Sequence, residues 1–416
     1  MSFGFFNNNN PVAVVSNGNT IESRFNTAYP KSTNTTGFTL NGVDICNYLT
    51  EYAPGFQTAN NYGFSVNGIN INQKFSFSKP VLSIAGGTVS ADANYRYYKF
   101  TTSGNNLTIT APNFQGIKDA LNTNPIRMRI LLVGGGGSGA QTQSGYGLYP
   151  GAGGGGAGSY VTIEFDINGS RFNNNVIKLS PTIGDGGGVT SAQNAGNPGQ
   201  ISSLLTELNT THTVTAGGGG GGYQIHGRIW SVNGFAYANS TLSGSSGGAT
   251  STTLEAGNYY YPYLTDPKGA TVVPESSVFA INAYYNRGGG AGNNGVVAVS
   301  GSHFQSTGGG GGGGAGAEGS GSPDFWSGGA GGAGKQWIDS NYYAGGGGGA
   351  NTSGGGTIGP GGSGGGGGTQ VVGGYGNGAA NTGGGGSGGW AGSVTTGGSG
   401  VCIIAIPIAS YNQYFV

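Results

Sequence analysis

Charged residues are scarce in this chain. Only 7% of the 416 residues are Asp, Glu, Lys or Arg, and 15 basic residues balance 15 acidic ones. Because nucleic-acid binding depends largely on neutralising phosphates, the lack of a basic stripe argues against a nucleic-acid partner. The longest apolar run, 401–409, is far shorter than the roughly 20 residues that span a bilayer. We therefore expect neither a nucleic-acid partner nor a membrane span.

Residues that carry metal or redox chemistry are also few. The two cysteines, Cys46 and Cys402, lie far apart and fit no metal spacing, so they are either free thiols or a disulfide. The three histidines, His212, His226 and His303, have no cysteine or carboxylate at ligand spacing. We expect no metal site and no catalytic histidine.

Gly134, Gly136 and Gly139 follow the apolar segment 130–133 and formally match a dinucleotide-binding fingerprint. That fingerprint needs a helix that begins at the glycines and an acidic residue about 20 positions further on. The residues that follow are further glycines and small polar residues, with no helix-forming segment. In a chain this rich in glycine the match is expected by chance, so we predict no enzyme and no cofactor.

Glycine is what the chain has in abundance, with 95 residues, and it is densest over 307–390. Within a helix or strand, glycine costs roughly 0.5 to 1 kcal/mol relative to alanine. Flexible linkers are poor in aromatic residues, whereas aromatic residues interrupt these runs. We therefore predict an ordered bundle, in which extended threefold helices of the polyproline type lie side by side and pair their backbones. The runs are 308–314, 345–349, 364–368 and 383–386.

In such a bundle the backbone hydrogen bonds only about offset the entropy that is lost when the chain is ordered. We therefore expect a conventional hydrophobic scaffold to hold the ends of the bundle. Alternating apolar residues predict strands on both sides of the glycine runs. The first two form a predicted hairpin around 103–105, and one helical turn is expected at 116–121. The predicted strands are 95–101, 107–109, 128–133, 160–167, 176–179 and 400–407.

A repeat occupies the N-terminal region, where 37–49 returns as 63–75. Apolar residues alternate around an Asn-Gly in each copy, which predicts two short strands and a tight turn. A module this short should dock on the main domain or on a neighbouring subunit, so it is a candidate assembly module. Its apolar positions are Phe38, Leu40, Val43, Ile45, Phe64, Val66, Ile69 and Ile71. We divide the chain into this module, 1–80, and a glycine-rich β domain, 81–416.

Five sequence blocks of the second region carry a resemblance to a known family. Residues 98–101, 129–137, 155–161, 179–188 and 398–404 resemble the glycine-rich domain of phage and viral fibre proteins and of bacterial surface proteins. They are also similar to the glycine-rich domain of anaplastic lymphoma kinase. The resemblance covers about 95–407 and implies a β-sandwich of the tumour-necrosis-factor or jelly-roll type, whose loops extend into packed polyglycine helices. The tyrosine-rich segment 241–286 lies outside this pattern.

Aromatic clusters between the glycine runs are the candidate interaction residues. They suit either a subunit interface and bundle caps, or contact with a receptor or glycan from loops on a rigid scaffold. They are Tyr259, Tyr260, Tyr261, Tyr263, Tyr284, Tyr285, Phe325, Trp326, Trp337, Tyr342 and Tyr343.

These observations favour a structural protein of a virion surface or extracellular filament, a homo-oligomer or polymer that contacts other virion or surface proteins. The N-terminal repeats also resemble those of fibre proteins of large DNA viruses and phages. The alternative is an adhesin that binds a cell-surface receptor or glycan. An ice-binding bundle is a weaker alternative, because the runs lack strict Gly-x-x triplets. The first residues contain neither a basic segment nor a long apolar segment, so no standard secretory signal is expected.

Overall fold

The computed structural model divides the chain into two compact units, residues 1–81 with 112–120, and 82–111 with 121–416. Before residue 81 it describes only the backbone of six short strands. Five later strands are likewise described by their backbone alone: β16 (Leu254–Glu255), β17 (Asn258–Tyr259), β18 (Asn282–Tyr285), β19 (Ala298–Ser300) and β20 (His303–Gln305). Otherwise it describes 81–415 except the following segments: 112–114, 142–150, 189–195, 209–210, 223–244, 246, 248–253, 256–257, 260–281, 286–297, 301–302, 306–307, 325, 352–356, 369–374 and 390–394.

The N-terminal unit contains three antiparallel hairpins of one pattern. The two predicted hairpins are confirmed as β3 (Thr39–Leu40) with β4 (Val43–Asp44), and β5 (Ser65–Val66) with β6 (Ile69–Asn70). A third pair, β1 (Val15–Ser16) with β2 (Asn19–Thr20), was not predicted. Each pair of strands is joined by Asn-Gly, the dipeptide that best accepts the positive φ values of a two-residue hairpin turn.

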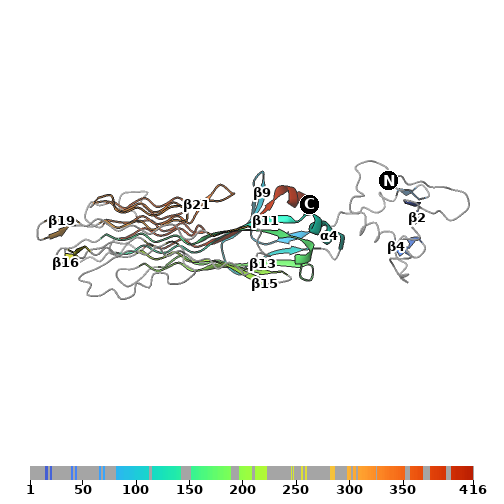
Figure 1. Cartoon of the computed structure of the whole chain (residues 1–416), viewed down its shortest axis with the longest axis horizontal. Coiled ribbons are helices and arrows are strands. Elements are labelled where there is room, and N and C mark those ends of the chain that lie inside the picture. The colour runs from blue at the N-terminus through green and yellow to red at the C-terminus, as the bar shows by residue number, and fades with distance from the viewer. Residues whose placement is uncertain are drawn as a thin grey trace, which may run out of the picture. The chain divides into compact units, whose positions relative to one another are not determined.

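The second unit is mainly β and is built on two antiparallel sheets (Figure 1). The six-stranded sheet has the order β18 (Asn282–Tyr285), β12 (Tyr160–Ile167), β11 (Ile126–Val133), β23 (Val401–Pro407), β9 (Tyr95–Phe100) and β8 (Thr88–Ala91). The five-stranded sheet has the order β15 (Thr211–Ala216), β14 (Ser202–Glu207), β13 (Val176–Thr182), β10 (Leu107–Thr110) and β7 (Ser83–Ala85). The predicted β scaffold is therefore present on both sides of the glycine runs.

The two sheets pack face to face, since β11 contacts β14 and β15, and β14 contacts β23. Strands β11 and β23 are the centre of the core: Ile130–Val133 and Val401–Ile406 are buried without a break. Alternating side chains point to opposite faces of a strand. Along these two buried stretches, both faces of the strand are therefore covered. The five-stranded sheet covers one face, and the aromatic cluster described below covers the other.

Cross-strand ion pairs support the register of β11 on β12. Arg127 lies opposite Asp166, and Arg129 lies opposite Glu164. Both pairs form salt bridges, with N···O distances of 3.1 Å and 2.7 Å. They lie on an exposed to half-buried face, so each contributes at most about 1 kcal/mol. Their value is in favouring this register over a slipped one.

The predicted hairpin between 95–101 and 107–109 is wrong. Both strands exist, as β9 and β10, but they belong to different sheets: β9 pairs with β8 and β23, whereas β10 pairs with β7 and β13. Gly104, with φ +89°, allows the chain to cross from one sheet to the other. Strand β10 alternates in burial, whereas Tyr97 and Tyr98 of β9 are both buried, because both faces of β9 are covered there.

The described residues contain two α-helices. The predicted helical turn at 116–121 is confirmed as α4 (Gln115–Thr123). At the other end of the sequence, α5 (Ile408–Tyr414) follows β23 directly and contacts β9 and β23. The guanidinium of Arg96 on β9 lies over the Tyr411 ring of α5, 4.5 Å from its centroid. This contact holds α5 against the six-stranded sheet.

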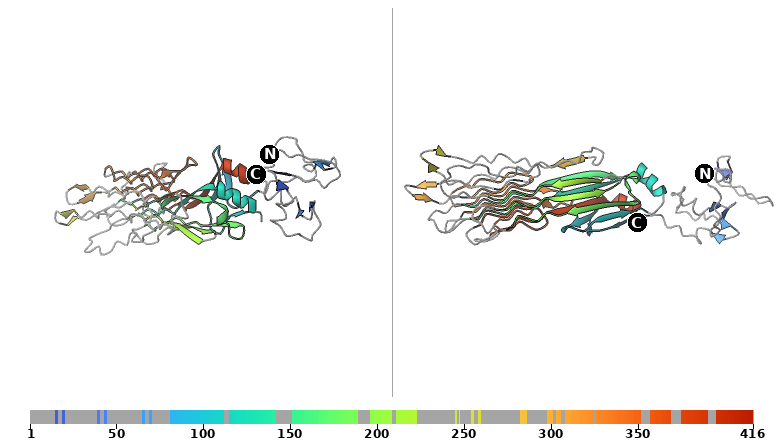
Figure 2. Two further views of the ribbon diagram at one scale, coloured as in Figure 1. Left: turned by 45° about the vertical axis from the view of Figure 1, so that its right-hand side comes forward. Right: turned by 90° about the horizontal axis from the view of Figure 1, so that it is seen from below.

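Glycine segments continue from the ends of the sheet strands and lie side by side (Figure 2). Their backbone hydrogen bonds join one segment to another, with a period of three. In the segment 154–159, successive N–H groups donate to three different segments and then return to the first. The donor and acceptor pairs are Gly154 to Gly310 and Ala157 to Gly313, Gly155 to Gly386 and Gly158 to Gly383, and Gly156 to Gly220 and Ser159 to Gly217.

Carbonyl groups of the same segment accept hydrogen bonds from three further neighbours. Gly156 accepts from Gly137, Gly155 accepts from Gly347, and Ala157 accepts from Ser245. The segment is therefore surrounded on all sides by other extended backbones. Its peptide groups are satisfied without helix or sheet, as buried backbone must be.

Close approach explains why these positions are glycine. A Cβ atom built on Gly155 would overlap the carbonyl oxygen of Gly137, and one built on Gly347 would overlap that of Gly386. Both residues are buried. Any larger residue would therefore push two hydrogen-bonded backbones apart.

Candidate functional site

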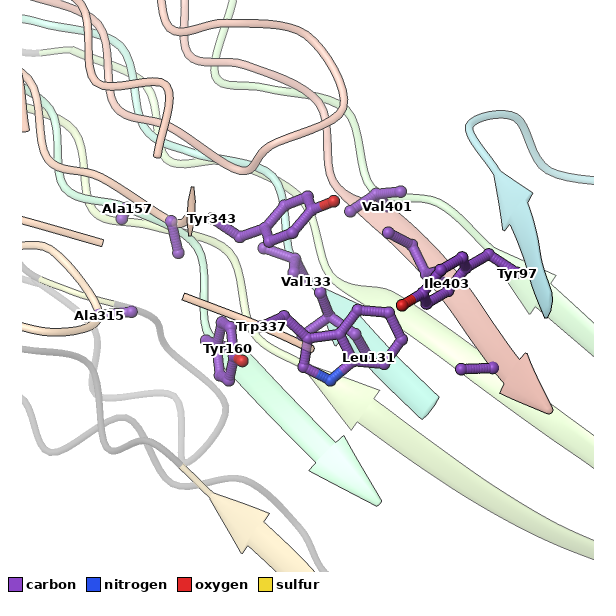
Figure 3. Packing of buried hydrophobic residues seen from close by; sticks show 12 residues of the cluster. Tyr97, Leu131, Val133, Ala157, Tyr160, Ala315, Trp337, Tyr343, Val401 and Ile403 are labelled. Atoms are coloured by element: carbon purple, nitrogen blue, oxygen red, sulfur yellow. The ribbon is translucent and has the colours of Figure 1, made fainter. Parts of the chain in front are cut away.

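An aromatic cluster joins the glycine segments to the sandwich. It is built around the hairpin of β21 (Lys335–Gln336) and β22 (Tyr342–Tyr343), which carries Trp337 in its loop. Trp337 is 7% exposed and Tyr343 is 3% exposed, and both pack on Leu131 and Val133 of β11 (Figure 3). The remaining members of the cluster are Tyr97, Ala157, Tyr160, Ala315, Ala344, Val401, Ile403 and Ala405. The hairpin therefore covers the outer face of the six-stranded sheet.

Two phenol–carboxylate hydrogen bonds fasten this cluster. The hydroxyl of Tyr97 donates to Oδ2 of Asp92 at 2.6 Å, and the hydroxyl of Tyr343 donates to Oδ2 of Asp339 at 2.7 Å. A third phenol, Tyr160, donates to the carbonyl of Gln336 at 3.3 Å. Hydrogen bonds to ionised acceptors are stronger than neutral ones, so they hold the rings in one orientation.

The same contacts shift the ionisation of these groups. Burial, together with the hydrogen bond to Asp339, raises the pKa of Tyr343, and burial with the hydrogen bond to Asp92 raises that of Tyr97. The pKa of Asp92 is lowered by the hydrogen bond from Tyr97 and by the backbone N–H groups of Tyr95 and Asn94. The cluster therefore favours neutral phenols at Tyr97 and Tyr343 and an ionised carboxylate at Asp92.

Ring contacts extend the cluster across β9. The Tyr97 and Trp337 ring centroids are 6.0 Å apart at an interplanar angle of 58°, within the range of favourable aromatic pairs. Tyr95 lies 6.1 Å from Tyr97, and the Arg129 guanidinium lies 5.5 Å from the Tyr95 ring centroid. The ring contacts thus run from the hairpin to β9, and Arg129 links them to β11.

Two of the predicted interaction residues are exposed. Tyr342 is 46% exposed, because it points to the opposite face of β22 from Tyr343. Trp326 is 54% exposed and lies in a turn where its backbone N–H donates to Oδ1 of Asp324 at 2.8 Å. Its carbonyl accepts from the N–H of Thr357. The two side chains are thus free for contact, while Trp337 and Tyr343 are used in the core.

The other predicted residues are placed only in part. Tyr259 lies in β17 (Asn258–Tyr259), which pairs with β16 (Leu254–Glu255). Tyr284 and Tyr285 lie in the edge strand β18, opposite Thr162 and Val161 of β12. Leu40, Val43, Val66 and Ile69 lie in the N-terminal hairpins. Outside the described residues lie Tyr260, Tyr261, Tyr263, Phe325, Phe38, Ile45, Phe64 and Ile71.

A second apolar cluster was not predicted. Ala140, Ala152, Ala350 and Ile358 are buried together, and Tyr375 packs against them. Ala152 and Ala350 exchange backbone hydrogen bonds at 3.0 Å and 2.8 Å. Alanine in place of glycine at these positions was the available signal, because a Cβ fits only where no neighbouring backbone approaches it closely.

Chemically reactive groups are sparse in the described part of the chain. No group of three or more His, Cys, Asp or Glu side chains there could hold a metal ion. Cys402 is a buried free thiol whose pKa is raised by burial. Among the described helices, none is long and apolar enough to cross a membrane. The described polar groups instead join segments to one another.

Comparison with known proteins points to one family. The family model for the glycine-rich domain matches residues 118–407, which include most strands of the sandwich and all the glycine segments. No curated protein matches the chain. The matched region covers well over half of the sequence. The chain therefore belongs to the glycine-rich domain family.

Proposed function

We propose that this protein is a non-enzymatic structural protein of a virion surface or an extracellular fibre or filament. The observation that supports this is the cross-linked glycine bundle. Segments from distant parts of the sequence are hydrogen-bonded to one another with a three-residue period, and an aromatic hairpin fastens them to the sandwich. A domain whose segments are hydrogen-bonded to one another in this way suits a mechanical role better than a catalytic role, which needs a cleft with reactive groups.

We further propose that the glycine segments are polyglycine II helices and that the sandwich is a jelly roll of the tumour-necrosis-factor type. A threefold helix presents successive peptide groups in three directions, which agrees with donors that return to the same neighbour at every third residue. Two face-to-face antiparallel sheets, connected by a crossing between β9 and β10, agree with the sandwich type.

The composition of the bundle supports an exposed, durable role. Residues 340–416 contain no Asp, Glu, Lys, Arg or His. The packing of these residues against one another therefore involves no acidic or basic side chain. Few proteases recognise a buried glycine backbone, since cleavage requires local opening of the chain. Both properties suit a protein that leaves the cell.

Assembly is assigned to the N-terminal repeats, with copies of this chain, and other virion or surface proteins, as partners. The test is the mass in solution of the full chain and of residues 81–416. A defined oligomer or filament for the full chain, and a monomer for 81–416, is the expected result. Compact monomers for both would overturn the structural proposal and favour the alternative.

The alternative is an adhesin that binds a receptor or glycan. The observation that favours it is Trp326, which is 54% exposed on a turn held by Asp324 and by the backbone of Thr357. An exposed aromatic ring on a rigid turn contributes contact area at little entropic cost. Binding of cells or of glycan arrays by the isolated 81–416 region would support this alternative.

A further inference from the structure

The N-terminal unit contains three copies of one sequence pattern, not two. Each copy reads Asn-Gly-x-x-Ile, followed by three residues, an apolar Phe or Leu, four residues and Pro. The copies begin at Asn17, Asn41 and Asn67, which are almost evenly spaced. The matching positions are Ile21, Phe25 and Pro30, then Ile45, Leu49 and Pro54, then Ile71, Phe75 and Pro80.

The backbone repeats with the sequence. The residue pairs that flank the turn are Ser16 with Asn19, Leu40 with Val43, and Val66 with Ile69, in the same antiparallel register each time. The first copy has polar residues in its strands, so apolar alternation does not reveal it. The Asn-Gly turn and the spaced Ile and Pro do.

One such hairpin cannot be stable alone. Two residues per strand give too few hydrogen bonds and too little apolar surface to offset the entropy of ordering. Repeats of this size gain stability by packing on equivalent units, and three or more copies are usually required. Three small units of one pattern in tandem therefore indicate a surface made of repeated, similar elements.

We propose that the three repeats bind, as three equivalent elements, the corresponding repeats of a second copy of this chain. This inference rests on the proposed function and specifies its partner. A partner must offer sites at the same spacing to engage all three repeats at once, and another copy of the same array does so by construction. The charges present no obstacle, because residues 1–80 carry four basic and three acidic side chains: Arg24, Lys31, Lys74, Lys79, Glu22, Asp44 and Glu51.

Several binding elements in one chain give a much higher overall affinity than any one of them alone. Once the first pair of repeats binds, the second and third bind at the effective concentration set by the short segments between them. Three weak contacts then give one strong association. The array therefore predicts graded rather than all-or-none loss of self-association as repeats are removed.

The test replaces the turn glycine of each repeat in the full chain: Gly18→Val, Gly42→Val and Gly68→Val, singly and together. A β-branched residue cannot adopt the positive φ that a two-residue Asn-Gly turn needs. Sedimentation equilibrium should show self-association weakened about ten- to a hundredfold by each single change, and abolished by all three. Gly188→Val is the matched control, since a Cβ there meets nothing within 4 Å.

The outcomes separate this inference from the proposed function. Unequal effects, in which one repeat accounts for all of the association, would overturn the inference and leave N-terminal assembly in place. Unchanged association of the triple variant would overturn both. The melting temperature of the sandwich should be the same in every variant, because residues 82–111 and 121–416 form their own compact unit.

Discussion

The backbone N–H of Gly347 donates to the carbonyl oxygen of Gly155 at an N···O distance of 2.9 Å. Almost two hundred positions of sequence separate these residues, and neither belongs to a helix or strand. The two residues pack this closely inside the bundle because neither has a Cβ: one on Gly155 would overlap Gly137, and one on Gly347 would overlap Gly386. Glycine here is a packing residue, in the same sense as leucine in a conventional core.

Adding one methyl group at Gly155 should therefore destabilise the fold. In Gly155→Ala the new Cβ would overlap the carbonyl oxygen of Gly137, and the segments must separate. We expect a loss of about 1 to 3 kcal/mol in the free energy of unfolding, the usual cost of overpacking. Denaturant titration measures it. Gly188→Ala, where a Cβ has open space, should change stability by less than about 0.5 kcal/mol. Equal effects of both changes would contradict the packing role.

Two tryptophans provide a matched pair for the aromatic cluster. Trp337→Ala empties a buried position against Leu131 and Tyr97, and should cost about 3 to 5 kcal/mol. Trp326→Ala removes a side chain that is 54% exposed, and should cost less than about 0.5 kcal/mol. Thermal unfolding compares them directly. A Trp326 variant as unstable as the Trp337 variant would show that the exposed ring has a structural role.

Stability should fall in alkaline solution. Burial raises the pKa of Tyr98 to about 12, and burial with the hydrogen bond to Asp339 also raises that of Tyr343, whereas unfolded phenols titrate near 10. Above pH 10 the unfolded chain therefore binds fewer protons than the folded one. The stabilisation is complete below pH 10 and is lost as the pH rises toward the folded pKa values.

Urea unfolding between pH 9 and pH 12 measures this slope. Tyr343→Phe removes one of the titrating groups, so its stability should decline less steeply with pH than that of the unchanged protein. The variant should also be less stable at pH 8, because the hydrogen bond to Asp339 is gone. Parallel curves for the two proteins would mean that Tyr343 does not contribute to the pH dependence.

Alanine substitutions separate the structural function from the adhesin alternative. Replacing Tyr259, Tyr260 and Tyr261 together with Trp326 removes four of the candidate contact residues. If these side chains contact a receptor, binding to cells or glycans is lost while the melting temperature is unchanged. A large fall in melting temperature would instead assign the tyrosines to packing. Unchanged assembly of this variant is expected under the structural function.

The sequence predicted the strands well because burial of one face leaves an alternating pattern, as in β12. It did not predict which strands pair. The segment 103–105 carries the residues of a hairpin turn, yet β9 takes β23 as its neighbour, from the far end of the sequence. Pairing of this kind depends on contacts among distant residues, which local pattern does not contain.

For the aromatic residues, the sequence did not show which side chains are buried. Tyr342 and Tyr343 are adjacent in sequence and identical in type, but one is 46% exposed and the other 3%. The difference arises because successive side chains of β22 point to opposite faces, and only the position of the hairpin on the sheet decides which face is buried. The sequence showed that these aromatic residues occur together. Only the fold shows which of them are buried and which are exposed.

The place of β23 has a consequence for synthesis. This strand lies between β11 and β9, in the middle of the six-stranded sheet, but it follows all the glycine segments in the sequence. On the ribosome, the nascent chain must therefore wait with an open sheet until Val401–Pro407 emerges. A translation product that ends before this strand leaves β11 and β9 without the neighbour they share. Only chains that carry an intact set of glycine segments and the strand beyond them can close the sandwich.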